Sequence, residues 1–499
     1  MKLLLIIKIL IFITLLLFAF SLWQRMPDID DAWIGEHAYW MSEKGYVKSE
    51  LMHGITGQDV RHIVHHKFFT LNGAMFISLF GFSLWTIKSV SLLWLAVFLL
   101  VFIGYIKRTL GSGTAWFALM LTTINALVFQ YSFVYRPEIM VMTLGFLSYL
   151  FLEKSIAKNY DRKLLIFSGL FAGIAAATHL NGLIFMAAGS ILLLWKHNFR
   201  SSLIFAVATL PAFAVYFYDF TFQYGISYWL YQINDSPALS KSSILPSSIA
   251  FAGKLFREHL RFFHSPKEIT LSLLFLFMLI VNFRNLKTDG TLLKYLLLLV
   301  IFLSLLAVHT TSKYILLYLP YMMLVIIRSF HHLYVHRKAT LPLWRGFNTQ
   351  NTFKWSLGLI GLFILVNTSW NIGIATEKFN PDKNYLLARK YMGNRTANLK
   401  ILAPMTFIFN EIDDFKRIQS DLSITEMHKS GTYLYGKGFL HYADSLKLDY
   451  LIISDEYKDR LGLANLKTED LSIYDYAVAG QEQGLTIIGK RQQFTHEQH

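Results

Sequence analysis

Long apolar runs recur along the sequence from Leu3 to Ile372 and stop after Thr376. The hydrocarbon core of a bilayer is about 30 Å thick, so each helical span needs about 20 mainly apolar residues. With 54% hydrophobic and only 16% charged residues, the chain has more apolar surface than a soluble fold can cover. We therefore predict a mainly α, polytopic membrane protein with about eleven transmembrane helices. The runs lie near residues 3–22, 84–106, 114–133, 139–152, 164–179, 181–195, 202–218, 268–283, 292–309, 314–330 and 355–373.

The net charge of +15 comes from Lys and Arg residues that stand at the ends of the apolar runs. A nucleic-acid partner requires these residues on one exposed face, so this class of partner is excluded. Their distribution instead indicates membrane orientation, because cytoplasmic loops are enriched in Lys and Arg. We predict a cytoplasmic N-terminus and an uncleaved first span. Residues 23–83, 134–138, 219–267 and 310–313, and the chain after residue 373, are then on the outer side.

Two domains follow from this pattern. Residues 1–375 form the predicted transmembrane domain, which includes a long first outer loop at 23–83. Its apolar stretch at 68–80 is short for a span, and we expect an interfacial or re-entrant helix. Residues 376–499 contain strand-like runs at 399–404, 448–454 and 485–489 that alternate with polar helical stretches. This alternation predicts a soluble extracytoplasmic α/β domain.

The first candidate site is an acidic cluster just beyond the first span, formed by Asp28, Asp30 and Asp31. A partly desolvated carboxylate at a membrane edge is suited to proton abstraction or to binding a cation. The alternative is a solvated N-cap for a helix that starts at Ala32, a common role for Asp. The pattern of residues leaves both interpretations open.

Three further outer turns carry polar residues. Arg136 and Glu138 flank Pro137 in a turn so short that both must lie at the interface, where they either bind a phosphate and a hydroxyl or pair with each other. Lys313, followed by Tyr314, is expected at the level of lipid phosphates and could pair with one. The alternative is that its side chain only snorkels to the interface, which is common for Lys. His179 stands at a sharp turn between two spans. It is either a residue that contacts the ligand or a hydrated turn residue.

Four histidines in the first outer loop suggest a metal site, but no pattern of carboxylates completes one: His53, His62, His65 and His66. The chain has no cysteine, so disulfides and thiolate metal sites are excluded. We predict that no cofactor is required, and a divalent metal is possible but not predicted.

Taken in order, these landmarks resemble the GT-C fold membrane glycosyltransferases, in the branch of the dolichyl-phosphate-mannose protein mannosyltransferases and the lipid A aminoarabinose transferase. That family has an acidic pair after the first span, a Lys/His-Pro-Pro-aromatic segment leading to a Phe-Gly turn, an Arg-Pro-Asp/Glu turn and a late Arg/Lys-Tyr before Leu-Pro. The matching residues here are Asp30-Asp31-Ala32, His66-Lys67-Phe68-Phe69 with Phe80-Gly81, Arg136-Pro137-Glu138, and Lys313-Tyr314 with Leu319-Pro320. The prolines of the second motif are absent.

The resemblance implies an inverting glycosyltransferase with a polyprenyl-phosphate-linked sugar as donor. It implies a multi-pass protein of the bacterial inner membrane, with its active site on the periplasmic face among membrane lipids. The acceptor is then a hydroxyl or phosphate of an envelope glycan, lipid or protein. The resemblance also implies that Asp30, with Asp31 beside it, acts as general base. The implied substrate-binding residues are Arg136, Glu138, Lys313, Tyr314, His179, His66 and Lys67.

Two other classes of protein fit the same architecture. A transporter or flippase of lipid-linked sugars would place its charged residues near the bilayer midplane, whereas here they stand at span ends. A noncatalytic assembly factor with an outer α/β domain would be indifferent to Asp30 and Asp31. We therefore favour the enzyme.

Overall fold

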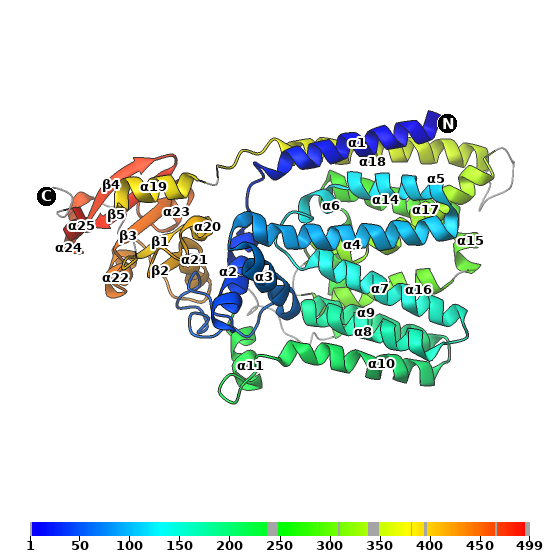
Figure 1. Ribbon diagram of the computed structural model, residues 1–499, viewed down its shortest axis with the longest axis horizontal. Coiled ribbons are helices and arrows are strands. Elements are labelled where there is room, and N and C mark those ends of the chain that lie inside the picture. The colour runs from blue at the N-terminus through cyan, green and yellow to red at the C-terminus, as the bar shows by residue number, and fades with distance from the viewer. Residues whose placement is uncertain are drawn as a thin grey trace.

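A long helical bundle makes up most of the protein, and a small sheet domain lies beyond one end of it (Figure 1). The computed structural model describes residues 2–236, 248–288, 290–307, 310–337, 349–380, 382–393, 397–464 and 467–494. The helices of the bundle run side by side and account for most of the first 375 residues; all but α6 have 13 residues or more. They are α1 (Lys2–Leu22), α4 (Leu84–Leu110), α5 (Ser112–Ile124), α6 (Ala126–Tyr131), α7 (Glu138–Ala157), α8 (Arg162–Thr178), α9 (Leu183–Trp195), α10 (Phe199–Phe213), α14 (Pro266–Val281), α16 (Gly290–Leu306), α17 (Leu319–Val335) and α18 (Thr349–Ala375).

Within the described residues, each of the predicted apolar runs falls on a helix or on two consecutive helices of this bundle, and positions 308 and 309 of the run at 292–309 lie outside the described residues. Among the described residues, five helices are long and apolar enough to cross a membrane on their own. These five are Leu4–Leu22, Leu84–Leu110, Glu138–Ala157, Phe199–Phe217 and Thr349–Ala375. A sixth candidate is bent by 104° between residues 252–262 and 266–281. The protein is therefore an integral membrane protein, and the number of eleven spans stays a prediction.

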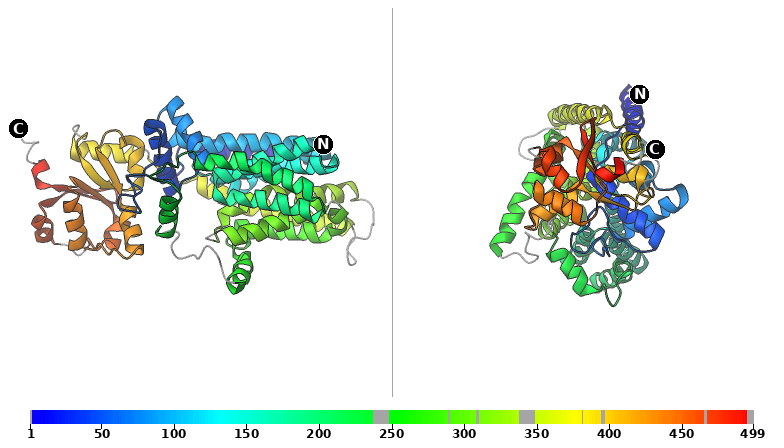
Figure 2. Two further views of the ribbon diagram at one scale, coloured as in Figure 1. Left: turned by 90° about the horizontal axis from the view of Figure 1, so that it is seen from below. Right: turned by 90° about the vertical axis from the view of Figure 1, so that its left-hand side faces the viewer.

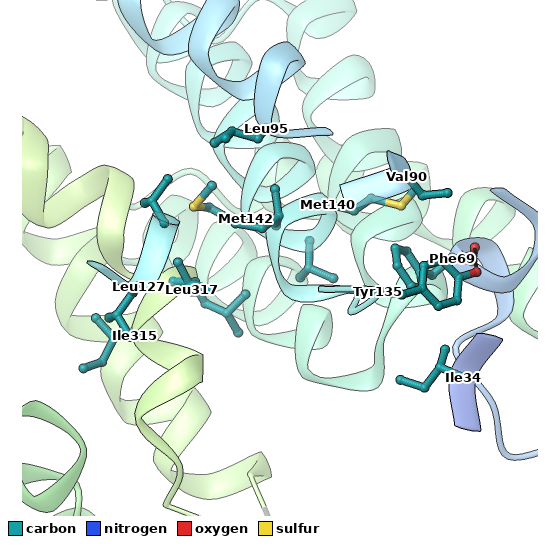
Figure 3. Close-up of a cluster of buried hydrophobic side chains, with 14 of the residues drawn as sticks. Ile34, Phe69, Val90, Leu95, Leu127, Tyr135, Met140, Met142, Ile315 and Leu317 are labelled. Atoms are coloured by element: carbon teal, nitrogen blue, oxygen red, sulfur yellow. Dashed lines mark hydrogen bonds between the residues drawn. The ribbon is translucent and has the colours of Figure 1, made fainter. Parts of the chain in front are cut away.

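The first outer loop folds over one end of the bundle, where α2 (Ile29–Lys44) and α3 (Lys67–Phe80) lie across the bundle axis (Figure 1). Their apolar sides face the bundle through Ile34 and Phe69, both buried (Figure 3). The ring centroids of Phe69 and Tyr135 are 4.4 Å apart. A side chain at Gly73 of α3 would overlap the Tyr135 hydroxyl. The prediction of a helix at 68–80 is thus confirmed, and its close packing fixes both helices of the loop.

Short helices occupy the remaining segments of the bundle. The segment between α10 and α14 contains α11 (Ile226–Asn234), α12 (Ser248–Arg257) and α13 (His259–Phe262). A 3-10 helix, η3 (Ser312–Leu317), leads into α17. Three more short helices connect longer ones: η1 (Leu180–Gly182), η2 (Ala214–Phe217) and α15 (Phe283–Thr288).

The domain beyond residue 380 is a five-stranded sheet flanked by short helices (Figures 1 and 2). The strand order is β2-β1-β3-β5-β4, in which β1 pairs in parallel with β2 and β3, while β5 is antiparallel to β3 and β4. The strands are β1 (Lys400–Ala403), β2 (Arg417–Ser420), β3 (Tyr450–Ser454), β4 (Tyr476–Glu482) and β5 (Leu485–Lys490). The helices are α19 (Lys383–Met392), η5 (Met405–Phe407), α20 (Ile408–Glu411), α21 (Asp421–Lys429), α22 (Lys437–Ser445), α23 (Asp455–Arg460), α24 (Thr468–Ile473) and α25 (Arg491–Phe494). The predicted α/β architecture is confirmed.

The sheet domain contacts the first outer loop at the end of β2. The Ser420 backbone N–H donates to the Leu51 carbonyl at 3.0 Å, and the Tyr39 hydroxyl of α2 donates to Asp413. Glu36 of α2 holds the same stretch of loop, because its carboxylate accepts hydrogen bonds from the Ser49 hydroxyl at 2.6 Å and from the backbone N–H groups of residues 50 and 51. The sheet domain therefore contacts α2, the helix that carries the acidic cluster, directly through Tyr39 and indirectly through the loop that Glu36 holds.

Candidate active site

The acidic cluster begins α2, and its three aspartates have different surroundings. Asp28 is the N-cap: its side chain accepts from the Asp30 N–H at 3.0 Å, while Asp31 accepts from the Asp28 N–H at 2.7 Å. This reciprocal arrangement is a capping box, which satisfies N–H groups that the first turn of a helix leaves without partners. The expected capping role thus belongs to Asp28, and the helix starts at Ile29 rather than at Ala32.

Asp31 is fully buried and ties α2 to the bundle. Its carboxylate lies 3.2 Å from the Lys88 ammonium of α4 and accepts the Tyr135 backbone N–H at 2.5 Å. No part of its side chain is exposed, and both of these partners belong to the bundle. The structure gives Asp31 the position of a structural anchor.

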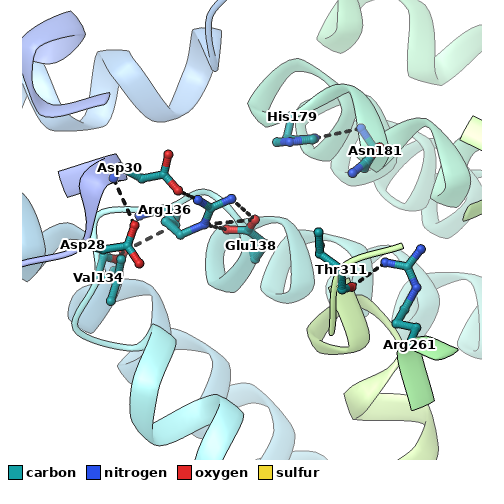
Figure 4. Close-up of polar contacts among 10 residues, drawn as sticks. Asp28, Asp30, Val134, Arg136, Glu138, His179, Asn181, Arg261 and Thr311 are labelled. Atoms are coloured by element: carbon teal, nitrogen blue, oxygen red, sulfur yellow. Dashed lines mark hydrogen bonds and ion pairs between the residues drawn. The ribbon is translucent and has the colours of Figure 1, made fainter. Parts of the chain in front are cut away.

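Asp30 points in the other direction, toward Arg136 in the turn between α6 and α7 (Figure 4). The Asp30 carboxylate forms an ion pair with Arg136 Nη1, and 21% of its side chain is exposed. On the opposite side, Arg136 Nη2 lies 2.7 Å from Glu138, and Nε also donates to Glu138 at 3.1 Å. This fork-like contact fixes the plane of the guanidinium. The result is a row of carboxylate, guanidinium and carboxylate, with Asp30 at the accessible end.

Two imidazoles stack beside this row. His66 precedes α3 and His179 follows α8, and their ring centroids are 4.6 Å apart with an interplanar angle of 19°. Burial lowers the pKa of His66 to about 4 and the pKa of His179 to about 3, so both rings are neutral near pH 7. The Asn181 backbone N–H donates to His179 Nδ1 at 2.9 Å, which places the proton of the neutral ring on Nε2. His179 therefore offers a hydrogen-bond donor, as an alcohol or phosphate ligand requires.

Lys313 completes the cluster from η3. Burial and the nearby Arg136 charge lower the pKa of the Lys313 ammonium. Within the described parts of the chain, Lys313 forms no ion pair, whereas Arg136 is shared by two carboxylates. Tyr314, the next residue, has its ring 6.0 Å from that of His179. Lys313 is thus a cation of this cluster whose charge no carboxylate of the described residues neutralises.

The structure does not bring Lys67 into this cluster. Its ammonium is buried and lies 2.6 Å from Asp219, whose other oxygen is 3.0 Å from His65 Nε2. Burial lowers the pKa of Lys67 to about 8. The sequence alone does not indicate Asp219, or Glu258 and Arg261, which contact Tyr318 and Thr311, because none of the three belongs to a motif or to a helix with a clear apolar period.

Three histidines of the first outer loop, His37, His62 and His65, lie close together. Ring centroids of His37, His62 and His65 are 4.7 to 6.2 Å apart. Both ring nitrogens of His65 are already engaged, by Thr70 at 3.1 Å and by Asp219. In the part of the chain that the structure describes, no group of three or more His, Cys, Asp or Glu side chains is arranged to hold a metal ion.

Comparisons with known proteins identify a related family and similar folds. Residues 69–218 match the family described as dolichyl-phosphate-mannose-protein mannosyltransferase. No curated protein sequence matches the chain. The structure is similar to that of ArnT from Cupriavidus metallidurans in the apo state, with a TM-score of 0.59, 11% identity and 97% of each chain covered.

Two further structures are similar. ArnT from the same organism bound to undecaprenyl phosphate gives a TM-score of 0.57 at 12% identity, again with 97% of each chain covered. The oligosaccharyltransferase of Archaeoglobus fulgidus in the apo form gives 0.57 at 12% identity, over 89% of this chain and 69% of that one. The resemblance inferred from sequence motifs is confirmed at the level of the fold, and the chain therefore has the GT-C fold of membrane glycosyltransferases.

Proposed function

We propose that this protein is an inverting glycosyltransferase that transfers a sugar from a polyprenyl-phosphate donor to an acceptor on the outer side of the membrane. The observation that carries the proposal is the row formed by Asp30, Arg136 and Glu138 at the end of a GT-C bundle. Lys313 lies beside this row and forms no ion pair with any residue that the structure describes. ArnT, which has the same fold, has been solved with undecaprenyl phosphate bound. A lipid-linked donor presents its sugar and phosphate at this level, so no nucleotide site is needed.

In the proposed reaction, Asp30 accepts the proton of an acceptor hydroxyl. As that oxygen bonds to the anomeric carbon from one face, the bond from this carbon to the phosphate oxygen breaks on the other face. The polyprenyl phosphate leaves with the bonding electrons and gains negative charge, which Lys313 and Arg136 stabilise. One bond forms, one breaks, and the configuration inverts.

The other residues of the cluster position these groups. Glu138 is buried and holds the Arg136 guanidinium in one plane, so the cation is preorganised for a phosphate. His179 Nε2–H and the Tyr314 hydroxyl are neutral donors suited to sugar hydroxyls, and His66 supports the His179 ring by stacking. Asp31 anchors α2 and takes no direct part. The proposed location is the bacterial inner membrane, with this cluster on the periplasmic side.

Transport of lipid-linked sugars is the competing function, and the position of the charges disfavours it. A transporter binds its substrate near the bilayer midplane, between half-helices. Here the cluster lies where α2 and α7 begin and α8 ends, that is, at helix ends rather than midway along the bundle. We therefore give the charged cluster a role in chemistry at the membrane surface.

The experiment is to purify the protein, extract co-purified lipid and identify it by mass spectrometry, and then to supply undecaprenyl-phosphate-linked sugars in proteoliposomes with envelope extracts as acceptor. Release of undecaprenyl phosphate with appearance of a glycosylated product supports the proposal. Movement of an intact fluorescent lipid-linked sugar across the bilayer, without release of the phosphate, would overturn it in favour of transport.

A further inference from the structure

The segment before α14 turns away from the bundle axis. Residues 252–262, which comprise the end of α12 and all of α13, make an angle of 104° with residues 266–281. If α14 crosses the membrane, a segment at this angle lies in the membrane plane. The left view of Figure 2 shows it as a green helix that projects sideways near the end of the bundle where α2 lies.

The outward side of this segment carries apolar and basic side chains together. Phe256, Leu260 and Phe263 are 77%, 50% and 40% exposed. Arg257 is exposed and Lys254 is half-buried on the same segment. Glu258, the acidic residue among positions 248–264, is buried. An interfacial helix has this composition, with apolar side chains that enter the acyl region and basic ones that meet anionic headgroups.

The inward side of the same segment holds the loop that contains Lys313. Arg261 is 1% exposed and donates from Nη1 to the Thr311 carbonyl at 2.7 Å (Figure 4). Glu258 accepts from Arg261 Nε at 2.7 Å and from the Tyr318 hydroxyl at 2.9 Å. The Arg261 guanidinium also lies 5.4 Å from the Tyr314 ring. One buried arginine therefore links the exposed helix to the Thr311 backbone before Lys313 and to the Tyr314 ring after it.

We propose that residues 252–263 dock on the anionic lipid headgroups of the outer leaflet, and that Arg261 transmits this docking to the Thr311–Tyr314 loop, so that the lipid surface positions Lys313. Charge complementarity favours anionic lipid as the partner, because no exposed acidic residue on the segment balances the positive charges of Lys254 and Arg257. Arg261 acts as a positioning residue through the Thr311 carbonyl. The significance of Lys313 rests on the proposed function, whereas the docking does not.

The docking is tested in the full-length protein, whose lack of cysteine allows a single label. Leu260→Cys carries an environment-sensitive fluorophore in proteoliposomes of phosphatidylcholine, alone or mixed with phosphatidylglycerol, that contain a headgroup-labelled quencher lipid. We expect stronger quenching in the anionic vesicles. Each basic residue near an anionic surface contributes a factor of about five, so Lys254→Gln with Arg257→Gln should reduce the docked-to-undocked ratio about 25-fold.

The matched control removes two positive charges elsewhere, by Lys458→Gln with Arg460→Gln in α23, and should leave the quenching unchanged. A label at position 260 that stays in water in both kinds of vesicle would overturn the docking. Equal loss of quenching in the control variant would also overturn it, because the effect would then be one of net charge.

The transmission is tested with a nitroxide at Thr310→Cys, an exposed position next to the Arg261 contact. We expect the nitroxide to be less mobile in anionic than in neutral vesicles, and Arg261→Gln to abolish that difference while the fluorophore at position 260 still docks. A lipid-dependent mobility that survives Arg261→Gln would overturn the role of Arg261. Neither measurement uses sugar transfer, so failure here and failure of the proposed function are distinguishable.

Discussion

Replacing Lys313 by methionine removes a positive charge and keeps most of the apolar stem. Since Lys313 forms no ion pair with the described residues, this change leaves no carboxylate unpaired, and the free energy of unfolding should change by less than about 1 kcal/mol. A hydrogen bond to a charged group contributes about 1.5–3 kcal/mol. If Lys313 contacts the donor phosphate, the dissociation constant for undecaprenyl phosphate should therefore rise about 10- to 150-fold.

Arg136→Gln is the informative comparison, because it leaves Asp30 and Glu138 facing each other without a cation. Breaking a buried ion pair costs about 3–5 kcal/mol, so this variant should lose both stability and donor binding. Binding of undecaprenyl phosphate is measured by thermophoresis in detergent, and unfolding by intrinsic fluorescence during heating. A Lys313→Met protein that binds the lipid with wild-type affinity would refute the assignment of Lys313 to the phosphate.

Three further predictions concern other parts of the molecule. Because the basic loops are predicted to be cytoplasmic, a single cysteine at Ser430 should react with an impermeant reagent in intact cells and one at Lys163 should not; the reverse pattern would contradict the orientation. Asp31→Asn leaves the buried Lys88 unpaired and should cost about 3–5 kcal/mol in thermal unfolding, while folded protein still transfers sugar; a stable but inactive variant would make Asp31 the base instead. Burial raises the pKa of Asp421 from 3.8 to about 7, so the folded state retains a proton that the unfolded state loses, and stability should fall as the pH rises through this range. The change is about 1.4 kcal/mol per pH unit. As the pH rises from about 4 to 7, the free energy of unfolding of the wild type should therefore fall by up to about 4 kcal/mol relative to that of Asp421→Asn. Melting temperatures of the two proteins that change in parallel with pH would contradict this.

The elements that could be predicted from the sequence are those with a local signal. Apolar runs of membrane length located the bundle helices, and the alternation after residue 380 located three of the five strands. The missed strands were β2, whose sequence Arg-Ile-Gln-Ser contains one apolar residue, and β4, whose residues are largely half-exposed. Polar or exposed strands lack the run of apolar residues that identifies a buried one.

The candidate site was predictable only where neighbouring residues in the chain are also neighbours in space. Arg136 and Glu138 share one turn, so their pairing was among the interpretations that the sequence allowed. The contrast between Asp30 and Asp31 was not predictable, because it depends on Lys88 and Tyr135, which come from distant segments. In the same way, Lys67 lies outside the cluster because it pairs with Asp219. The sequence did not indicate this pairing, since the two residues are 152 positions apart.

Asp30 is the group on which the proposed chemistry depends, and Asp30→Asn tests it most directly. Asparagine preserves the size of the side chain and much of its hydrogen bonding, but it cannot take a proton from the acceptor hydroxyl. The measurement is the single-turnover rate of sugar transfer in proteoliposomes, made alongside undecaprenyl phosphate affinity. We expect the rate to fall by about 10²–10⁴ with donor affinity retained. Transfer at the wild-type rate by purified Asp30→Asn would contradict the mechanism proposed for this protein.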